Sequence, residues 1–408
     1  MADRHRPRRG SMAYSPRKRA KRQFGRVKSW PEADVDSVRV QGFAGWKAGM
    51  THILMRDNNP FSPSRGQEVR KAVTVVEVPA LRVLAVRGYR MTPYGLQTAG
   101  EAWANPEQLN SDVAGLFPRL AKPSRAEKEL AEGIKIQKRG GRIAQPNRYA
   151  VNLSDDDSHD DLLRTEAGHV VRFNSREEAE SSAKHNNGKL KVLSEHDQDA
   201  HLENLSGQDL SEVRIIVSTQ PDHVRSVPSK VPEIMEMMLT GGDTQAKLDW
   251  AKEHLGKEFE FGDVFEAGKD VDVIGVTKGK GWQGVIKRFG VKLLSHKNSK
   301  RRRQIGNMGD FGTGYVRKTI RQAGQMGYHQ RTELNKRIIT VGDPKEDNIT
   351  PDGGFLHYGE VRNQYILIQG SLPGPAKRLL RFRDPTRPRG GEFPLEITYI
   401  STSSKQGV

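Results

Sequence analysis

Three features of the sequence have the residue types of enzyme sites. Residues 279–284 read GKGWQG and fit the G-x-G-x-x-G spacing of the glycine loops in dinucleotide-binding proteins and protein kinases. Residues 310–312 read DFG, which in kinases supplies an aspartate that holds magnesium. The chain also has twelve histidines and many carboxylates, the groups used in acid–base catalysis and metal binding. Whether any of them does chemistry depends on the surrounding elements.

Those surrounding elements are missing from the sequence. A dinucleotide site requires a helix after its glycine loop and an acid about twenty residues later. Here residues 285–294 read VIKRFGVKLL, which favours a strand, and no acid follows before Asp310. A kinase requires a lysine strand, a helix glutamate and a His-Arg-Asp loop between its two motifs. No His-Glu-x-x-His and no Gly-x-Ser-x-Gly is present either, so we predict a protein that is not an enzyme.

Composition narrows the class further. The 408 residues include no cysteine, which excludes a disulfide framework, a thiol nucleophile and a cysteine zinc site. No run of about 18 apolar residues is present, and the first 28 residues lack the apolar block of a signal peptide. We therefore expect no membrane association and a cytoplasmic location.

Positive charge is concentrated in two segments. Residues 1–28 hold eleven basic residues and one acid, and residues 276–337 hold sixteen basic residues and two acids. The rest of the chain is net negative, although the whole chain carries a charge of +17. Neither segment has a period of 2 or 3.6, so neither can bury one face, and we expect the first to be disordered until bound. Such segments are typical of proteins that bind nucleic acid.

These segments supply the candidate contact residues. Lys and Arg bind phosphates by releasing counterions, and flat side chains stack on unpaired bases. The candidates in the first segment are Arg8, Arg9, Arg17, Lys18, Arg19, Lys21 and Arg22. The candidates in the second segment are Lys278, Lys280, Trp282, Lys287, Arg288, Lys297, Lys300, Arg301, Arg302, Arg303, Phe311, Tyr315, Arg317, Lys318, Arg321, Gln325, Tyr328, His329, Gln330, Arg331 and Lys336. Among them we expect Phe311, Tyr328 and His329 to make stacking or shape contacts.

The remaining sequence predicts a mainly β fold with some helix. Residues 71–89 read as two valine-rich strands separated by Pro79. Residues 53–55 indicate a strand after a glycine-rich turn. One helix is clear, capped by Asp243 or Thr244 and ended by Gly256. Short strands with glycine and proline turns favour a barrel or sandwich over a doubly wound sheet.

A different kind of segment lies between the strands. Residues 152–209 carry fourteen acids against six basic residues, and a helix capped by Ser124 precedes them. The acidic run lacks the Asp-x-Asp-x-Asp-Gly spacing of a calcium loop. We interpret it as a solvated insertion that avoids nucleic acid.

Several long strings resemble one family. They are DVIGVTKGKGWQGVIKRFGV, RRRQIGNMG, AGQMGYHQRTELNKRI, DGGFLHYGEV, SLPGPAKRLLRF, VQGFAGWKAGMTH and GGDTQAKLDWA. In this order they are similar to the universal large-subunit ribosomal protein three, in its archaeal and eukaryotic branch. The likeness covers nearly the whole chain except the acidic insertion.

The resemblance implies a translation-factor-like β-barrel with a long basic internal loop, a basic N-terminal extension and an acidic α/β-type insertion. The implied domains are an extension at 1–45, a barrel from 46–100, 210–276 and 338–408 with a helical excursion near 230–256, an insertion at 101–209 that is acidic from 152, and a loop at 277–337 that penetrates RNA. Phe311 stands where the family's loop carries a tip tryptophan.

The resemblance also implies a function. The family's members are structural proteins that bind near the 3′ region of the large ribosomal RNA, support early subunit assembly and reach toward the peptidyl transferase centre. The expected partners are that RNA and neighbouring large-subunit proteins, with no small-molecule substrate. We expect no cofactor beyond structural Mg²⁺ ions that accompany the RNA.

Two other functions fit basic segments. An RNA-acting enzyme would use them to grip its substrate, and it would need a pocket of converging acid and base groups. A DNA-compacting protein would use them on any phosphate lattice, and excess duplex DNA would compete for its binding. Pocket geometry and DNA competition distinguish these alternatives from ribosomal RNA binding.

Overall fold

A computed structural model gives the structure of the protein. It describes residues 14–32, 35–104, 149–152, 189–192, 198–298, 300–309, 314–388 and 395–404, together with Ser181, Lys184 and Gly312. Strands predominate in this part of the chain, so the prediction of a mainly β fold with some helix is confirmed. None of its helices is long and apolar enough to cross a membrane.

Six strands pair in a closed ring. They belong to a sheet made of β2 (Gly42–Arg56), β3 (Glu68–Glu77), β11 (Asp270–Val276), β14 (Gln330–Gly342), β15 (Tyr365–Gln369), β16 (Leu379–Arg383) and β17 (Glu396–Ile400). The order is β16-β11-β14-β15-β3-β2-β17, and β16 also pairs with the first part of β2. This last pairing closes the ring, and β17 pairs with the far end of β2. We call this sheet the closed sheet.

The glycines of β2 lie inside the strand and not in the turn expected from the sequence. A Cβ atom on Gly45 would stand 2.6 Å from Val78 Cγ1, and one on Gly49 would stand 2.5 Å from Phe355 Cδ1. Any larger residue would push these neighbours away, so glycine allows side chains to pack directly on the strand. The sequence pattern GFAGWKAGM gave no alternation that would reveal this use of glycine.

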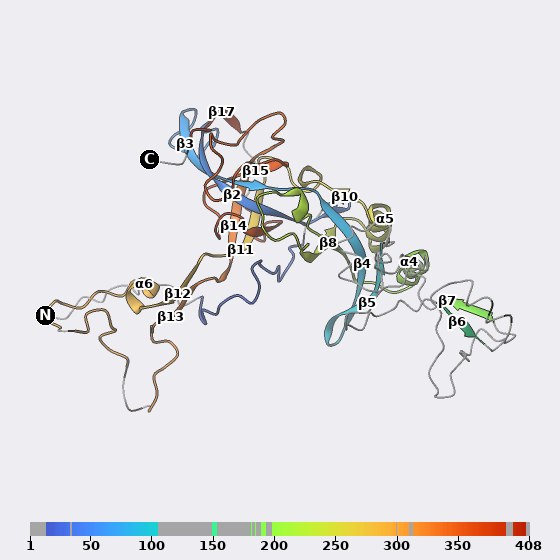
Figure 1. Ribbon diagram of the computed structural model, residues 1–408, viewed down its shortest axis with the longest axis horizontal. Coiled ribbons are helices and arrows are strands. Elements are labelled where there is room, and N and C mark those ends of the chain that lie inside the picture. The colour runs from blue at the N-terminus through green and yellow to red at the C-terminus, as the bar shows by residue number, and fades with distance from the viewer. Residues whose placement is uncertain are drawn as a thin grey trace, which may run out of the picture.

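A second sheet lies beside the closed sheet (Figure 1). It contains β1 (Arg39–Val40), β4 (Leu81–Thr92), β5 (Gly95–Trp103), β8 (Glu212–Ser218), β9 (Ile234–Thr240) and β10 (Glu258–Phe259). The order is β1-β9-β8-β4-β10, and β5 pairs with β4. The sequence interpretation assigned most of these strands to the barrel, because short apolar runs do not reveal which strands pair.

Helices pack against the second sheet. They are α4 (Gln198–Ser206) and α5 (Thr244–His254), and two 3₁₀ turns lie at Pro221–His223 and Phe261–Asp263. The predicted helix is confirmed as α5, with Asp243 at its N-cap and Gly256 in the left-handed region after it. Its apolar residues Leu248 and Ala251 are buried against the sheet.

One hydrophobic core joins the two sheets. At its centre Phe43 of β2 meets Phe259 and Phe261 edge to face, with ring centroids 5.6 and 5.2 Å apart. Phe382 of β16 meets Phe261 in the same way at 6.0 Å. These rings bury large apolar areas and fix the angle between the sheets, so the loop that leaves the closed sheet starts from a rigid base.

The long basic segment leaves the closed sheet as an extended hairpin. The last paired residues of β11 and β14 are Val276 and Gln330. Beyond them β12 (Gly279–Gln283) and β13 (Gly324–Gly327) continue the pairing as a two-stranded stem. Figure 1 shows this stem projecting away from both sheets, with the remaining loop beyond it. The structure places residues 330–337, predicted as part of the loop, in β14.

A short helix corrects the prediction of a strand after residues 279–284. α6 (Val285–Phe289) follows Gly284 directly and ends at Gly290, which has φ = 65°. Val285 and Phe289 lie four residues apart and are both buried, so this one turn has an apolar side that the sequence pattern did not reveal. The presence of this helix removes one of the two arguments against a dinucleotide site. The other argument still holds, because the sequence has no acidic residue at the required distance after the glycine loop.

The predicted insertion at 101–209 lies largely outside the described residues. Within it β6 (Tyr149–Asn152) pairs with β7 (Lys189–Val192). The predicted helix capped by Ser124 and most of the acidic run fall outside the description.

Candidate nucleic-acid interface

The N-terminal segment, residues 14–32, is ordered against the end of the basic loop. The backbone N–H of Ala20 donates to the Tyr328 carbonyl at 2.8 Å. The Gln330 side chain accepts from the Arg26 N–H at 3.1 Å and donates to the Arg26 carbonyl at 2.7 Å. The expectation that this segment is disordered until bound is therefore wrong for residues 14–32. The segment is held by hydrogen bonds of its backbone, and apolar periodicity in the sequence does not reveal such bonds.

Strand β16 holds the same segment from the other side. Arg378 donates from Nη1 to the Gln23 carbonyl at 3.0 Å. Arg383 donates to the hydroxyl of Ser29 at 3.0 Å and to its carbonyl. The Arg381 guanidinium lies 4.9 Å from the centre of the Phe24 ring. The two basic segments, which the sequence presents as separate, thus meet on one side of the closed sheet.

Stacked guanidinium groups complete the contact. Arg17 lies 4.2 Å from the centre of the Phe289 ring of α6 and donates to the Arg288 carbonyl at 2.7 Å. Arg19 and Arg378 each lie 5.4 Å from the ring centre of Tyr328. The contacts of Tyr328 use an aromatic face that the sequence interpretation assigned to nucleic-acid bases.

Most of the predicted phosphate-binding cations are exposed. This group includes Lys18, Arg19, Lys21, Arg22, Lys278, Lys280, Lys287, Lys297, Lys300, Arg301, Arg302, Arg303, Arg317 and Lys318. Two aromatic candidates are exposed as well, Trp282 at 77% on β12 and Tyr315 at 70% in the loop. Charge on the surface beside exposed flat rings is the arrangement that binds single-stranded or irregular nucleic acid.

Other candidates serve the structure of the stem. Arg288 donates to the carbonyls of Gln325 at 3.0 Å and Gln322 at 2.7 Å, so it bridges the two sides of the loop. The amide of Gln325 donates to the Gly327 carbonyl at 2.9 Å. Lys336 forms an ion pair with Glu333 at 2.9 Å. Arg321, Gln330 and Arg331 are half-buried.

The structure contradicts the stacking role predicted for His329. Its side chain is buried, with 6% of its surface exposed, and its Nδ1 lies 2.8 Å from the Lys18 carbonyl. Burial is the main cause that lowers the pKa of His329, and the nearby charges of Arg331, Arg17 and Arg288 act in the same direction. Tyr328 is half-buried beneath its two arginines. Arg8, Arg9 and Phe311 lie outside the described residues.

Three cations of the closed sheet join the interface without any sequence signal. Lys47 in β2 is buried at 8% exposure, and burial together with the Lys278 charge lowers its pKa to about 8. Burial also lowers the pKa of Arg381 to about 10. Arg378 follows the proline-glycine turn before β16. A single basic residue within an apolar run is normally interpreted as a side chain that faces solvent. The sequence alone therefore does not identify Lys47, Arg378 or Arg381 as interface residues.

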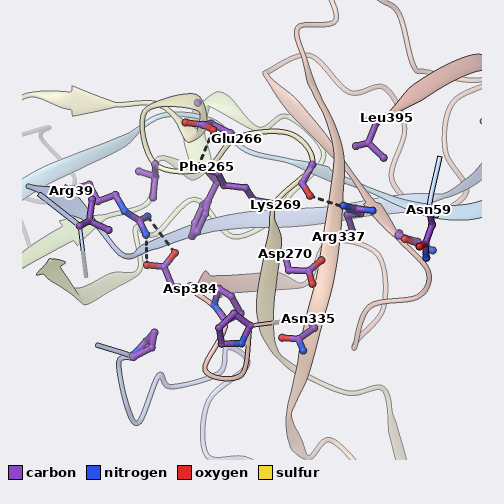
Figure 2. Close-up of a pocket in the computed structure, with 18 of the residues that line it drawn as sticks. Arg39, Asn59, Phe265, Glu266, Lys269, Asp270, Asn335, Arg337, Asp384 and Leu395 are labelled. Atoms are coloured by element: carbon purple, nitrogen blue, oxygen red, sulfur yellow. Dashed lines mark hydrogen bonds and ion pairs between the residues drawn. The ribbon is translucent and has the colours of Figure 1, made fainter. Parts of the chain in front are cut away.

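A cleft of about 1420 Å³ lies elsewhere and carries mixed charge (Figure 2). Arg39 points to Asp384 and forms an ion pair at 2.8 Å, and Lys269 pairs with Glu266 at 3.0 Å. Arg337 donates to the Gly268 carbonyl at 3.0 Å. Four of its charged side chains thus pair with one another. No cluster of three metal-ligating side chains occurs within the part of the chain that the structure describes.

Comparison with known proteins decides the family. Residues 1–119 and 165–407 match the family model described as Ribosomal protein L3. The chain belongs to this family. L3 proteins are structural components of the ribosome, so the prediction that the chain is not an enzyme is confirmed. The GKGWQG and DFG strings are parts of the L3 loop and not of a catalytic site.

Archaeal L3 proteins match over their full length. The large ribosomal subunit protein uL3 of Archaeoglobus fulgidus is 42% identical over 406 residues, which cover 99% of each chain. That of Picrophilus torridus is 41% identical over 410 residues, and that of Methanocaldococcus jannaschii is 39% identical over 407. The predicted membership in the archaeal branch is therefore confirmed. The L3 family model leaves out residues 120–164, which include the start of the acidic segment 152–209, and it matches the rest of that segment.

Proposed function

We propose that the protein binds large-subunit ribosomal RNA through one continuous basic surface. This surface consists of the N-terminal segment 14–32 and the loop 277–329 with its stem. The observation that carries the proposal is that these segments contact each other and together present exposed cations. Asp310 is the only acidic residue that the sequence places in 14–31 and 277–332. A surface of this kind gains affinity from each phosphate that it neutralises.

The shape of the loop favours folded RNA over a flat partner. The paired strands of the stem lead the basic loop away from the closed sheet (Figure 1). We propose that the basic run Lys300–Arg303 in this loop reaches between RNA helices. Single strands, bulges and junctions of RNA offer splayed bases to exposed rings such as Trp282. The closed sheet stays outside, where neighbouring large-subunit proteins contact it.

Membership in the L3 family supports a finer proposal for the placement of the protein. The RNA partner is the region near the 3′ end of the large ribosomal RNA, and the loop points toward the peptidyl transferase centre. A protein that fills the space between RNA helices supports their early folding, so we assign it a role in subunit assembly. The chain requires no cofactor of its own, and structural Mg²⁺ ions belong to the RNA.

The test is salt-dependent binding to a transcript of the 3′ region of large ribosomal RNA. Replacing Arg301, Arg302 and Arg303 with alanine should weaken binding and flatten the log–log salt slope by about one unit for each lost phosphate contact. A matched control replaces Arg65, Arg90 and Lys257, which are exposed cations outside the basic surface. An equal slope change in both triple variants would remove the loop from the interface.

A competition experiment distinguishes RNA from DNA as the polyanion. Binding to the transcript should persist in excess duplex DNA, because the loop fits irregular RNA shape and not a uniform groove. Complete displacement by duplex DNA would support the DNA-compacting alternative.

A further inference from the structure

A second cavity lies where the stem leaves the closed sheet. Its volume is about 510 Å³, within the range of about 300–1,000 Å³ that is typical of small-ligand sites. Its walls come from the N-terminal segment, β2, the turn between β11 and β12, the end of β13 with the start of β14, and the turn before β16. The side chains important here are Arg17, Lys47, Lys278, Lys280, His329 and Arg331. We call this cavity the stem cavity.

The lining of the stem cavity is cationic. Five of its lining residues are Lys or Arg, and none is Asp or Glu. Lys47 is buried, and its Nζ donates to the carbonyls of Leu372 at 2.7 Å and Gly374 at 3.1 Å. Burial and the charge of Lys278 disfavour its protonated form, and the charge of Glu333 favours it to a smaller extent. An anion placed among these cations would relieve that repulsion, so the cavity is suited to a phosphate group.

His329 adds an acceptor to this set of donors. A backbone carbonyl only accepts hydrogen bonds, so Nδ1 carries the proton that bonds to Lys18. Burial and the charges of Arg331, Arg17 and Arg288 favour the neutral ring, which leaves a lone pair on Nε2. Nε2 is buried and has no hydrogen-bond partner among the described residues. A hydroxyl group entering with the phosphate would provide the missing donor.

The wall of the cavity beside His329 is fixed by close backbone packing. Gly327 has φ = 71°, and a Cβ atom there would stand 2.0 Å from the Lys278 carbonyl oxygen. The Lys278 carbonyl also accepts from the Tyr328 N–H at 3.1 Å. The stem therefore holds Lys278 and His329 in register, and a ligand would meet a preformed site.

We propose that the stem cavity binds one ribose-phosphate unit of RNA. The lysines and arginines hold the phosphate, and Nε2 of His329 accepts a hydrogen bond from the ribose 2′-hydroxyl. The inference rests on the RNA binding proposed above and adds a site that distinguishes RNA from DNA, because DNA lacks this hydroxyl. Its position at the root of the stem would fix the direction in which the loop enters the RNA.

The test uses the full chain with 5′-phosphorylated diuridylate and its 2′-deoxy counterpart as probes. The nitrogen signals of labelled histidine report binding, and the His329 signals are assigned by their absence in His329→Asn. The ribo probe should bind about fivefold more tightly than the deoxy probe, as expected for one hydrogen bond. It should also shift the Nε2 signal while that nitrogen stays unprotonated. Equal affinities, or a protonated Nε2, would overturn the role of the 2′-hydroxyl.

Variants separate the two halves of the site. His329→Asn keeps an amide that can donate to the Lys18 carbonyl, but this shorter side chain places no acceptor at the position of Nε2. Both probes should then bind equally and at the deoxy level. Replacing Lys278 and Lys280 with glutamine should weaken both probes about fivefold or more. The matched control replaces Lys257 and Lys345, exposed lysines outside both the cavity and the basic surface, and should change affinity less than twofold.

The transcript of the proposed-function experiment distinguishes two kinds of failure. If the transcript binds but the Lys278/Lys280 variant binds the probes like its control, the stem cavity is not the phosphate site and the RNA-binding function stands. If neither transcript nor probes bind, the proposed function fails with it.

Discussion

Arg383 and Asp272 form a buried ion pair at 3.2 Å, with side chains 8% and 0% exposed. The pair joins β16 to β11, the strand from which the loop emerges. Asp272 also accepts from the Asn335 N–H at 3.0 Å, and Arg383 also bonds Ser29 of the N-terminal segment. One charged pair therefore connects the closed sheet with both basic segments.

Replacing Arg383 with methionine should destabilise the protein by about 3–5 kcal/mol, because it leaves the Asp272 carboxylate buried and uncompensated. Urea unfolding of the free chain measures this loss. Replacing both residues, Arg383 with methionine and Asp272 with asparagine, should recover part of the stability because no buried charge remains. A single variant as stable as the parent would show that the pair does not hold β11 and β16 together.

Limited proteolysis should distinguish the two basic segments in the free protein. Trypsin should cleave the exposed run Lys300–Arg303 faster than the bonds at Arg17 and Lys18, because contacts with Arg288 and His329 hold the latter. Mass spectrometry of the first fragments identifies the order of cleavage. The variant His329→Ala should speed cleavage at Lys18 and leave cleavage at Arg301 unchanged. Equal initial rates in the unmodified chain would contradict the ordered N-terminal segment.

Trp282 should stack on a base of the bound RNA. Its exposed ring has no packing role to lose, and stacking contributes about 1–3 kcal/mol per base. Trp282→Ala should therefore lower the affinity for the rRNA transcript about tenfold. Tyr94, exposed at 94% at the tip of the β4–β5 hairpin, provides the control. Tyr94→Ala should leave affinity unchanged, and an equal loss in both variants would argue against a specific stacking site.

The turn after β2 should lose stability in acid. The hydroxyls of Ser62 and Ser64 donate to Asp57 at 2.6 and 2.7 Å and lower its pKa to about 2. A carboxylate with a lowered pKa stabilises the fold above its unfolded value of 3.8 and loses that contribution as pH falls toward 2. The melting-temperature difference between the parent and Asp57→Asn should shrink from pH 5 to pH 2.5. A constant difference would show that the hydroxyl contacts do not depend on the charge.

Sequence reasoning succeeded where a residue's role depends on its own neighbourhood. The helix α5 was predicted through its cap at Asp243 and its stop at Gly256. The charge of Lys300–Arg303 and the exposure of Trp282 also depend only on a segment that lacks an apolar face. The family resemblance also depended only on contiguous stretches of sequence, and the match to the L3 family confirms it.

It failed where a role depends on segments far apart in the chain. His329 looked like a stacking residue, but the carbonyl that buries it comes from Lys18. Lys47 gave no signal at all, because the cavity that gives it a role is formed by five distant segments. Strand partners were also undetermined, and the second sheet was therefore merged with the barrel.

The closure of the sheet affects how the length of the loop can change during evolution. Val276 and Gln330 are paired residues of β11 and β14, so the stem and loop between them form one long hairpin connection. The chain entropy of such a connection grows only with the logarithm of its length, about 0.6 kcal/mol for each doubling. Insertions and deletions in the loop therefore leave the strand register of the closed sheet unchanged. The loop can vary in length with the RNA around it while the closed sheet keeps the same strand pairing.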